Sequence, residues 1–165
     1  MTQLEIIQKK IYHLENLPNQ LTVWRFQEKK IVWTNGVFDL LHLGHIDYLS
    51  KARDLGDILI VGVNTDASVR RIKKAGRPIQ DEKARSTIVA ALHFVDAVIL
   101  FDEDTPYELI KLVQPDVLVK GSDYKAEDIV GSDIVLAKGG TVETIDFLPG
   151  YSTTAIEEKI KGSRM

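Results

Sequence analysis

The sequence of 165 residues contains no cysteine, which excludes a disulfide framework and a thiolate metal site. This suits a reducing compartment, and because residues 1–20 lack an apolar signal-peptide core we expect a cytoplasmic protein. No segment approaches the roughly 18 apolar residues of a membrane span, so we expect no membrane partner. A basic surplus is also missing, since 21 lysines and arginines face 24 aspartates and glutamates. A general nucleic-acid binder usually carries that surplus, so we expect no nucleic-acid partner.

What is present is an alternation of apolar, strand-like runs with helix-like segments. The strand-like runs are residues 29–36, 58–64, 97–101, 116–120 and 141–148, and the helix-like segments are 45–57, 81–95, 105–113, 125–140 (broken) and 152–162. Such alternation predicts an α/β fold with a doubly wound, Rossmann-like parallel sheet and helices on both faces. Expected helix signals are N-caps at Asp81 and Thr105, Pro106 at the first helical position, and Gly56 as a stop.

The N-terminal segment is predicted to be one amphipathic helix. Leu4, Ile7, Ile11 and Leu14 recur at helical spacing, and Pro18 follows them. We therefore expect a leading helix within residues 1–20, followed by one domain over residues 21–165.

Four loops, 34–45, 64–78, 120–125 and 148–154, each follow a predicted strand. Ligands of a doubly wound sheet bind beyond the carboxyl ends of the strands, so we expect these loops to line one edge.

The first loop, "TNGVFDLLHLGH", carries two of the four histidines, His42 and His45, three residues apart. Near the start of a helix these rings share a face, where free N–H groups and the helix dipole favour an anion. Gly44 permits close approach of a ligand, and Asn35–Gly36 permits a tight turn. The pattern favours a phosphate site with imidazole donors. Two alternatives stay open. The histidines are ordinary polar residues near a helix start, or they form a metal site with Asp39, for which the sequence offers no fourth ligand nearby.

The second loop carries a basic segment, residues 70–77, with five cations uninterrupted by an acid: Arg70, Arg71, Lys73, Lys74 and Arg77. In a chain of net charge −3 this creates a local positive field that can hold a triphosphate or a second anionic substrate. The alternative is a solvated charge run. Which cation meets the reacting phosphates does not follow from the sequence.

The remaining two loops offer hydroxyl and amide groups. Ser152, Thr153 and Thr154 open a predicted helix, where they can hold phosphate or simply cap the helix. Lys120, Gly121, Asp123 and Tyr124 follow a strand, with a structural turn as the alternative reading.

"HLGH" after "TNGVFD" resembles the HxGH signature of the nucleotidyltransferase superfamily. Further stretches, "GVNTDASVRRIK", "GRPI", "FDEDTPYELI", "PDVLVKGSDY" and "GYSTTAI", resemble the heptose 1-phosphate adenylyltransferase family over roughly residues 21–160. The resemblance implies the HxGH nucleotidyltransferase fold and transfer of an adenylyl group from ATP, with Mg²⁺, to a sugar phosphate. The implied product is ADP-heptose for lipopolysaccharide core or another surface glycan. Relatives are often homodimers, and the leading helix is a candidate interface.

The resemblance also implies roles for individual residues, with no metal ligand among them. Catalytic residues are His42, His45 and Lys74. Nucleotide-binding residues are Thr34, Asn35, Gly36, Phe38, Gly44, His45, Lys120, Gly121, Asp123, Ser152, Thr153 and Thr154. Residues for the acceptor substrate are Asp39, Asp66, Arg77 and Arg85, and for Arg85 a structural salt bridge is the alternative.

One position departs from the superfamily pattern. Glu157 stands where the second signature often carries a basic residue, so the basic segment is expected to supply that charge. The nearest competing family is glycerol-3-phosphate cytidylyltransferase, which usually has an arginine just before "STT" that is missing here. A non-catalytic nucleotide sensor is the competing reading from another class.

Overall fold

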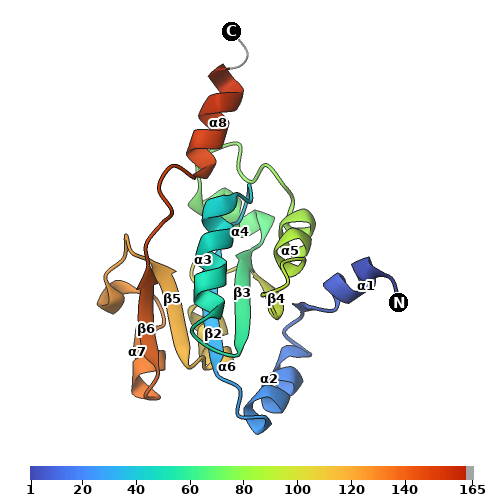
Figure 1. Cartoon of the computed structure of the whole chain (residues 1–165), viewed down its shortest axis with the longest axis vertical. Coiled ribbons are helices and arrows are strands. Elements are labelled where there is room, and N and C mark those ends of the chain that lie inside the picture. Colours follow the sequence, from blue (N-terminus) through green and yellow to red (C-terminus); the bar gives the residue numbers. More distant parts are fainter. Residues whose placement is uncertain (163–165) are drawn as a thin grey trace.

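The sheet of the computed structural model, which describes residues 1–162, is six-stranded and all parallel. Its order is β1-β4-β3-β2-β5-β6 (Figure 1). The strands are β1 (Ile11–Tyr12), β2 (Ile31–Gly36), β3 (Ile58–Asn64), β4 (Ala97–Phe101), β5 (Val117–Gly121) and β6 (Thr141–Ile145). The predicted α/β fold with a doubly wound parallel sheet is therefore confirmed.

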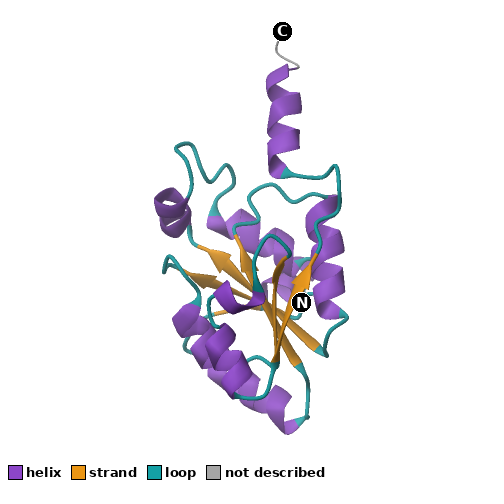
Figure 2. Ribbon diagram, turned by 90° about the vertical axis from the view of Figure 1, so that its left-hand side faces the viewer, coloured by secondary structure: helices purple, strands orange, loops and turns teal. Residues whose placement is uncertain are grey.

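Helices cover both faces of this sheet (Figure 2). They are α1 (Gln3–Gln8), α2 (Leu17–Phe26), α3 (Leu43–Arg53), α4 (Asp66–Ile72), α5 (Glu82–Ala90), α6 (Tyr107–Val113), α7 (Ser132–Ala137) and α8 (Thr153–Gly162), with a 3₁₀ turn η1 (Ala126–Asp128). Helices α2, α6 and α7 pack on one face, and α3 and α5 on the other. No helix within residues 1–162 is both long and apolar enough to cross a membrane.

Strand β3 shows how the sequence specifies the two-sided core. All seven of its residues are buried, because successive side chains point to opposite faces and both faces are covered. Leu59 and Val61 join the core under α3 and α5, whereas Ile58 and Ile60 join the core under α2 and α6.

The predicted single leading helix is wrong. Helix α1 ends at Gln8, and Ile11 and Tyr12 then form a short edge strand that pairs with Val98 and Ile99 of β4. Lys10 fixes this strand by donating to the Leu92 and Val95 carbonyls at 3.2 and 2.8 Å. Pro18 lies in the first turn of α2 rather than after the end of a helix, because proline fits that turn, where its missing N–H leaves no bond unmade.

Three local expectations also need correction. Residues 66–72, expected as loop, form helix α4, capped by the Thr65 hydroxyl accepting from the Ser68 N–H at 3.1 Å. Helix α3 ends before Gly56, whose lack of a side chain instead allows close packing: a Cβ there would lie 2.8 Å from the Lys30 carbonyl oxygen. Pro106, not Thr105, is the N-cap of α6. The N-cap at Asp81 is confirmed.

Candidate active site

The candidate site lies where the strand order reverses. From β2 the chain steps to β3 and β4 on one side and later to β5 and β6 on the other, which creates a crevice between the ends of β2 and β5. Asn35 and Gly36 end β2, and Lys120 and Gly121 end β5. The Lys120 ammonium approaches the Asn35 carbonyl oxygen at 3.5 Å, so the first and third loops meet as expected.

The two histidines lie at the start of α3 with their rings stacked. Their centroids are 3.9 Å apart with an interplanar angle of 25°, and His42 is the N-cap residue of the helix. Burial lowers the pKa of His42. The pKa of His45 falls to about 4, through burial first and the neighbouring His42 second. Both rings are therefore neutral at pH 7 in the free protein, with nitrogens available for hydrogen bonds rather than charge.

Three buried polar atoms at this turn have no partner within residues 1–162: Asn35 Oδ1, His42 Nδ1 and His45 Nδ1. Leaving a buried polar group unpaired costs about 1–3 kcal/mol, so a cluster of them is a candidate ligand site. Asn35 Oδ1 is an acceptor, and each neutral imidazole nitrogen can donate or accept, so the cluster suits a ligand that offers both phosphate oxygens and hydroxyl or amino groups.

Backbone conformation brings the turn close to the fourth loop. Phe38 adopts a left-handed conformation, φ 50°, and its ring packs edge-on against His45 with centroids 5.3 Å apart. Strained backbone of this kind is concentrated at functional sites. A Cβ on Gly44 would lie 3.2 Å from the Tyr151 carbonyl oxygen, so residues just before α8 reach the start of α3.

Asp39 ties the first loop to the basic segment. Its carboxylate, 6% exposed, accepts from Arg77 Nη1 at 2.7 Å and from the Ile79 and Gln80 N–H groups at 2.8 and 2.9 Å. Burial raises the pKa of Asp39, but the hydrogen bonds from Gln80, Ile79 and Arg77 outweigh it and the net pKa is lowered. Gln80 adds a bond from its side-chain amide to the Asp39 carbonyl at 2.7 Å. Asp39 thus positions the loop, a function that is distinct from the predicted substrate contact.

The basic segment divides into a helical and a loop part. Arg70 and Arg71 lie in the last turn of α4, and Arg71 is held by Asp104 at 2.9 Å. Arg77 bridges two carboxylates, Asp39 and Glu157 of α8, while the Lys74 side chain is 72% exposed and lies 3.8 Å from Glu157. Lys74 is therefore the freer of these two cations, and Arg77 is occupied.

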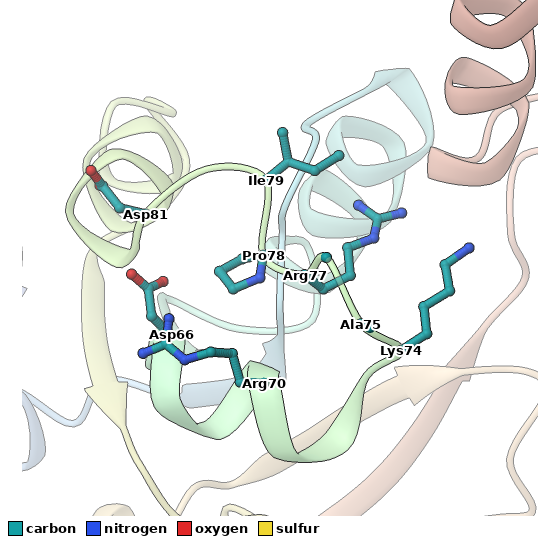
Figure 3. A pocket seen from close by; sticks show the side chains of 9 residues that line it. Asp66, Arg70, Lys74, Ala75, Arg77, Pro78, Ile79 and Asp81 are labelled. Carbon is teal, nitrogen blue, oxygen red and sulfur yellow. The ribbon is translucent and has the colours of Figure 1, made fainter.

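A cavity of about 590 Å³ adjoins this segment (Figure 3). Its lining includes Arg70, Lys74 and Arg77 on the basic side and Asp66 and Asp81 on the acidic side. Cations for a phosphate and carboxylates for hydroxyl groups suit a phosphorylated sugar.

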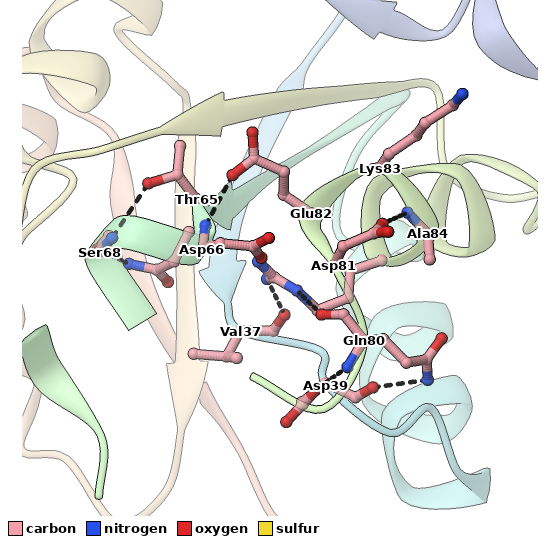
Figure 4. A network of polar contacts seen from close by, with 12 residues as sticks. Val37, Asp39, Thr65, Asp66, Ser68, Gln80, Asp81, Glu82, Lys83 and Ala84 are labelled. Carbon is pink, nitrogen blue, oxygen red and sulfur yellow. Dashed lines mark hydrogen bonds and ion pairs between the residues drawn. The ribbon is translucent and has the colours of Figure 1, made fainter. Parts of the chain in front are cut away.

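Arg85 holds three segments of the chain together from inside the protein. Its side chain is fully buried and donates to Asp66 Oδ1 at 2.8 Å, the Val37 carbonyl at 2.7 Å and the Gln80 carbonyl at 3.0 Å. Figure 4 shows these acceptors converging from the first loop, α4 and the segment before α5. Arg85 therefore forms a structural salt bridge, which is the alternative to substrate binding that the sequence left open for this residue. Asp66, 22% exposed, is its partner.

Thr34 is also internal. It is fully buried and shares a 2.8 Å hydrogen bond with the Tyr48 hydroxyl, whose pKa burial raises to about 12. The side chain thus holds α3 against β2 and is not open to a nucleotide.

The third and fourth loops retain features of a ligand site. Burial lowers the pKa of Lys120 to about 8, against the opposing effect of Asp123. Gly121 is buried beneath the Phe147 ring, which leaves no room for a side chain. Ser152 caps α8 by accepting from the Ala155 N–H at 3.0 Å, as the capping alternative predicted. Thr153 and Thr154 begin the same helix.

Residues 1–162 contain no group of three or more histidine or acidic side chains placed to hold an ion. The Asp39 carboxylate, the third member of the suggested His42–His45 set, is used by Arg77, Ile79 and Gln80.

Sequence reasoning missed the contacts made by Gln80 and Glu157. Gln80 lies 41 residues from Asp39, and no local pattern announced the contact. Glu157 did give a signal, because an acid stood where a base was expected, but the sequence did not identify its partners.

A parallel sheet with paired histidines at a switch point, beside a basic loop, is the arrangement expected of a nucleotidyltransferase. The chain belongs to the cytidylyltransferase-like family, which matches residues 33–159.

Individual relatives agree with this membership. A protein named bifunctional protein HldE from Citrifermentans bemidjiense is 54% identical over 93% of this chain and 32% of its own length. The chain thus spans about a third of the length of the curated relatives that it matches. A solved lipopolysaccharide core biosynthesis protein from Thermoplasma volcanium is 36% identical, with a TM-score of 0.59, covering 73% of this chain and 97% of that one. A pantoate–β-alanine ligase from Francisella tularensis, 16% identical over 94% of this chain and 78% of that one with a TM-score of 0.56, shares the fold.

Proposed function

We propose that the chain transfers the adenylyl group of ATP to D-glycero-D-manno-heptose 1-phosphate, giving ADP-heptose and pyrophosphate. The observation that carries the proposal is the cluster of unpaired polar atoms on Asn35, His42 and His45 at the switch point. The likeness to proteins named bifunctional HldE supports the choice of substrates, and the likeness to a lipopolysaccharide core biosynthesis protein supports the use of the product.

The chemistry requires positioning and charge stabilisation more than a base. A phosphate oxygen of the sugar phosphate attacks the α-phosphorus of ATP, the bond to the bridging oxygen of the β-phosphate breaks, and pyrophosphate leaves. The attacking oxygen is already ionised, so no proton must be removed. His42, His45 and the start of α3 donate hydrogen bonds to the oxygens of the α-phosphate, and Lys74 adds positive charge.

The acceptor is proposed to occupy the cavity beside the basic segment. Arg70 and Lys74 attract its phosphate, and Asp66 and Asp81 offer oxygens to its hydroxyl groups. ATP is proposed to enter as its Mg²⁺ complex, in which the triphosphate itself holds the ion.

The test is pyrophosphate release with Mg²⁺, using ATP or CTP against heptose 1-phosphate or glycerol 3-phosphate. The expected result is pyrophosphate release only in the mixture of ATP and heptose 1-phosphate. Release with CTP and glycerol 3-phosphate would keep the reaction type and overturn the substrates. No pyrophosphate release in any of the four mixtures, together with nucleotide binding by calorimetry, would favour a non-catalytic nucleotide sensor.

A homodimer is proposed as the working form, since relatives are often dimers. Size-exclusion chromatography with light scattering tests it, and a monomer at assay concentration refutes it.

A further inference from the structure

Helix α8 has little apolar packing to hold it in place. It projects away from the body of the molecule in Figure 1, and none of its residues is buried. Ile160 is 54% exposed, and a groove of about 440 Å³, lined in part by Leu40, Ile79 and Ile160, lies between the helix and the basic segment. Because burial of apolar area supplies little free energy here, polar contacts must fix the helix position.

Glu157 supplies such contacts. Its carboxylate pairs with Arg77 and lies 3.8 Å from the Lys74 ammonium. Figure 3 shows both cations reaching in one direction, toward the helix at the red end of the colour scale. The Glu157 and Arg77 side chains are only 14% and 13% exposed, so water screens this pair much less than it screens a surface ion pair.

The same arginine continues the connection. Arg77 Nη1 donates to Asp39 at 2.7 Å, and Asp39 is 6% exposed in the turn that leads to the histidines. Asp39, Arg77 and Glu157 therefore join the β2–α3 turn, the basic segment and α8.

We infer that Glu157 is a positioning residue for nucleotide binding, holding the start of α8 and the basic segment together as one phosphate site. The inference rests on the proposed function, because Lys74 is proposed to add charge at the reacting phosphate and the family resemblance assigns Ser152, Thr153 and Thr154 to the nucleotide. Glu157 itself touches neither ATP nor the reacting atoms; it acts through Arg77 and Lys74.

The consequence is a split between binding and turnover. When a binding-competent state is only partly populated, the apparent dissociation constant rises in inverse proportion to that population. If loss of the Glu157 charge lowers the docked fraction of α8 to about one tenth, ATP affinity falls about tenfold. Bound ATP restores the docked state, so kcat at saturating ATP changes by less than about threefold.

The test compares Glu157→Gln with Glu158→Gln, a neighbouring exposed acid of the same helix. ATP affinity is measured by calorimetry with Mg²⁺, turnover by pyrophosphate release, and docking by hydrogen exchange of the α8 amides. Glu157→Gln is expected to weaken ATP binding about tenfold, preserve kcat and speed exchange in α8. Glu158→Gln is expected to match the wild type, and Glu157→Asp to recover part of the affinity.

Each contrary result identifies what failed. Tighter ATP binding by Glu157→Gln would mean that Glu157 competes with the phosphates, which overturns the inference. If the wild type binds ATP and Glu157→Gln binds it with the same affinity, the inference is overturned as well. A wild type that binds no ATP would refute the proposed function, and the exchange rates would still decide whether Glu157 docks the helix.

Discussion

Replacing Arg85 by alanine separates a structural role from a substrate-binding role. The variant removes a fully buried guanidinium and leaves the Asp66 carboxylate and the Val37 and Gln80 carbonyl oxygens without their donor. Breaking a buried ion pair by removing one partner costs about 3–5 kcal/mol. The partial exposure of Asp66, 22%, lets water recover part of that cost, so we expect a value near 3 kcal/mol.

The assay is thermal unfolding followed by circular dichroism. For a domain of this size each kcal/mol shifts the melting temperature by about 2–4 °C, so Arg85→Ala is expected to melt roughly 6–12 °C below the wild type. Lys83→Ala, an exposed change on the same helix, is the control and should stay within about 0.5 kcal/mol of the wild type. An Arg85→Ala protein with an unchanged melting temperature and a raised KM for the sugar phosphate would refute the structural reasoning.

Four further predictions concern the site. Because the pKa of His45 is lowered to about 4, the free energy of unfolding should fall as the pH drops from about 6.5 toward 4, and urea titrations should show a weaker fall in His45→Gln. Replacing His42 by alanine should lower kcat for pyrophosphate release by about 10²–10³ with little change in melting temperature, and near-normal turnover contradicts the assignment. Gly44→Ala places a Cβ 3.2 Å from the Tyr151 carbonyl oxygen and should weaken ATP binding in calorimetry. Unchanged affinity would show that the loop around Tyr151 moves to make room for the methyl group without affecting the site. With the pKa of Lys120 near 8, kcat/KM for ATP should fall above pH 8 as the ammonium loses its charge, and Lys120→Met should remove that fall.

Local sequence patterns were enough to predict much of this protein. The unbroken apolar run 58–64 predicted a strand buried on both faces, and β3 is buried throughout. The alternation of strands and helices predicted a parallel sheet, and with it the edge where the first and third loops meet. Such patterns suffice because side-chain periodicity and turn chemistry are properties of neighbouring residues.

The same patterns failed where a distant partner decided the outcome. Residues 4–17 have helical spacing, yet Ile11 and Tyr12 form a strand because the open edge of β4 offers them hydrogen bonds. Thr65 and Asp66 read as loop but begin α4, where the Glu82 carboxylate accepts from the Asp66 N–H at 2.7 Å.

Short-range sequence patterns reveal the chemistry that is available: paired histidines at a strand–helix turn, a run of cations, and hydroxyl groups at a helix start. Which of these groups remain free for a ligand depends on how the folded chain pairs them. Arg77 is held by Asp39 and Glu157, and Arg85 by Asp66, whereas Lys74 keeps most of its side chain in water. Ion pairs between residues far apart in the chain depend on where the fold brings them. No local pattern could therefore separate the cations that hold the site together from those left to meet a phosphate.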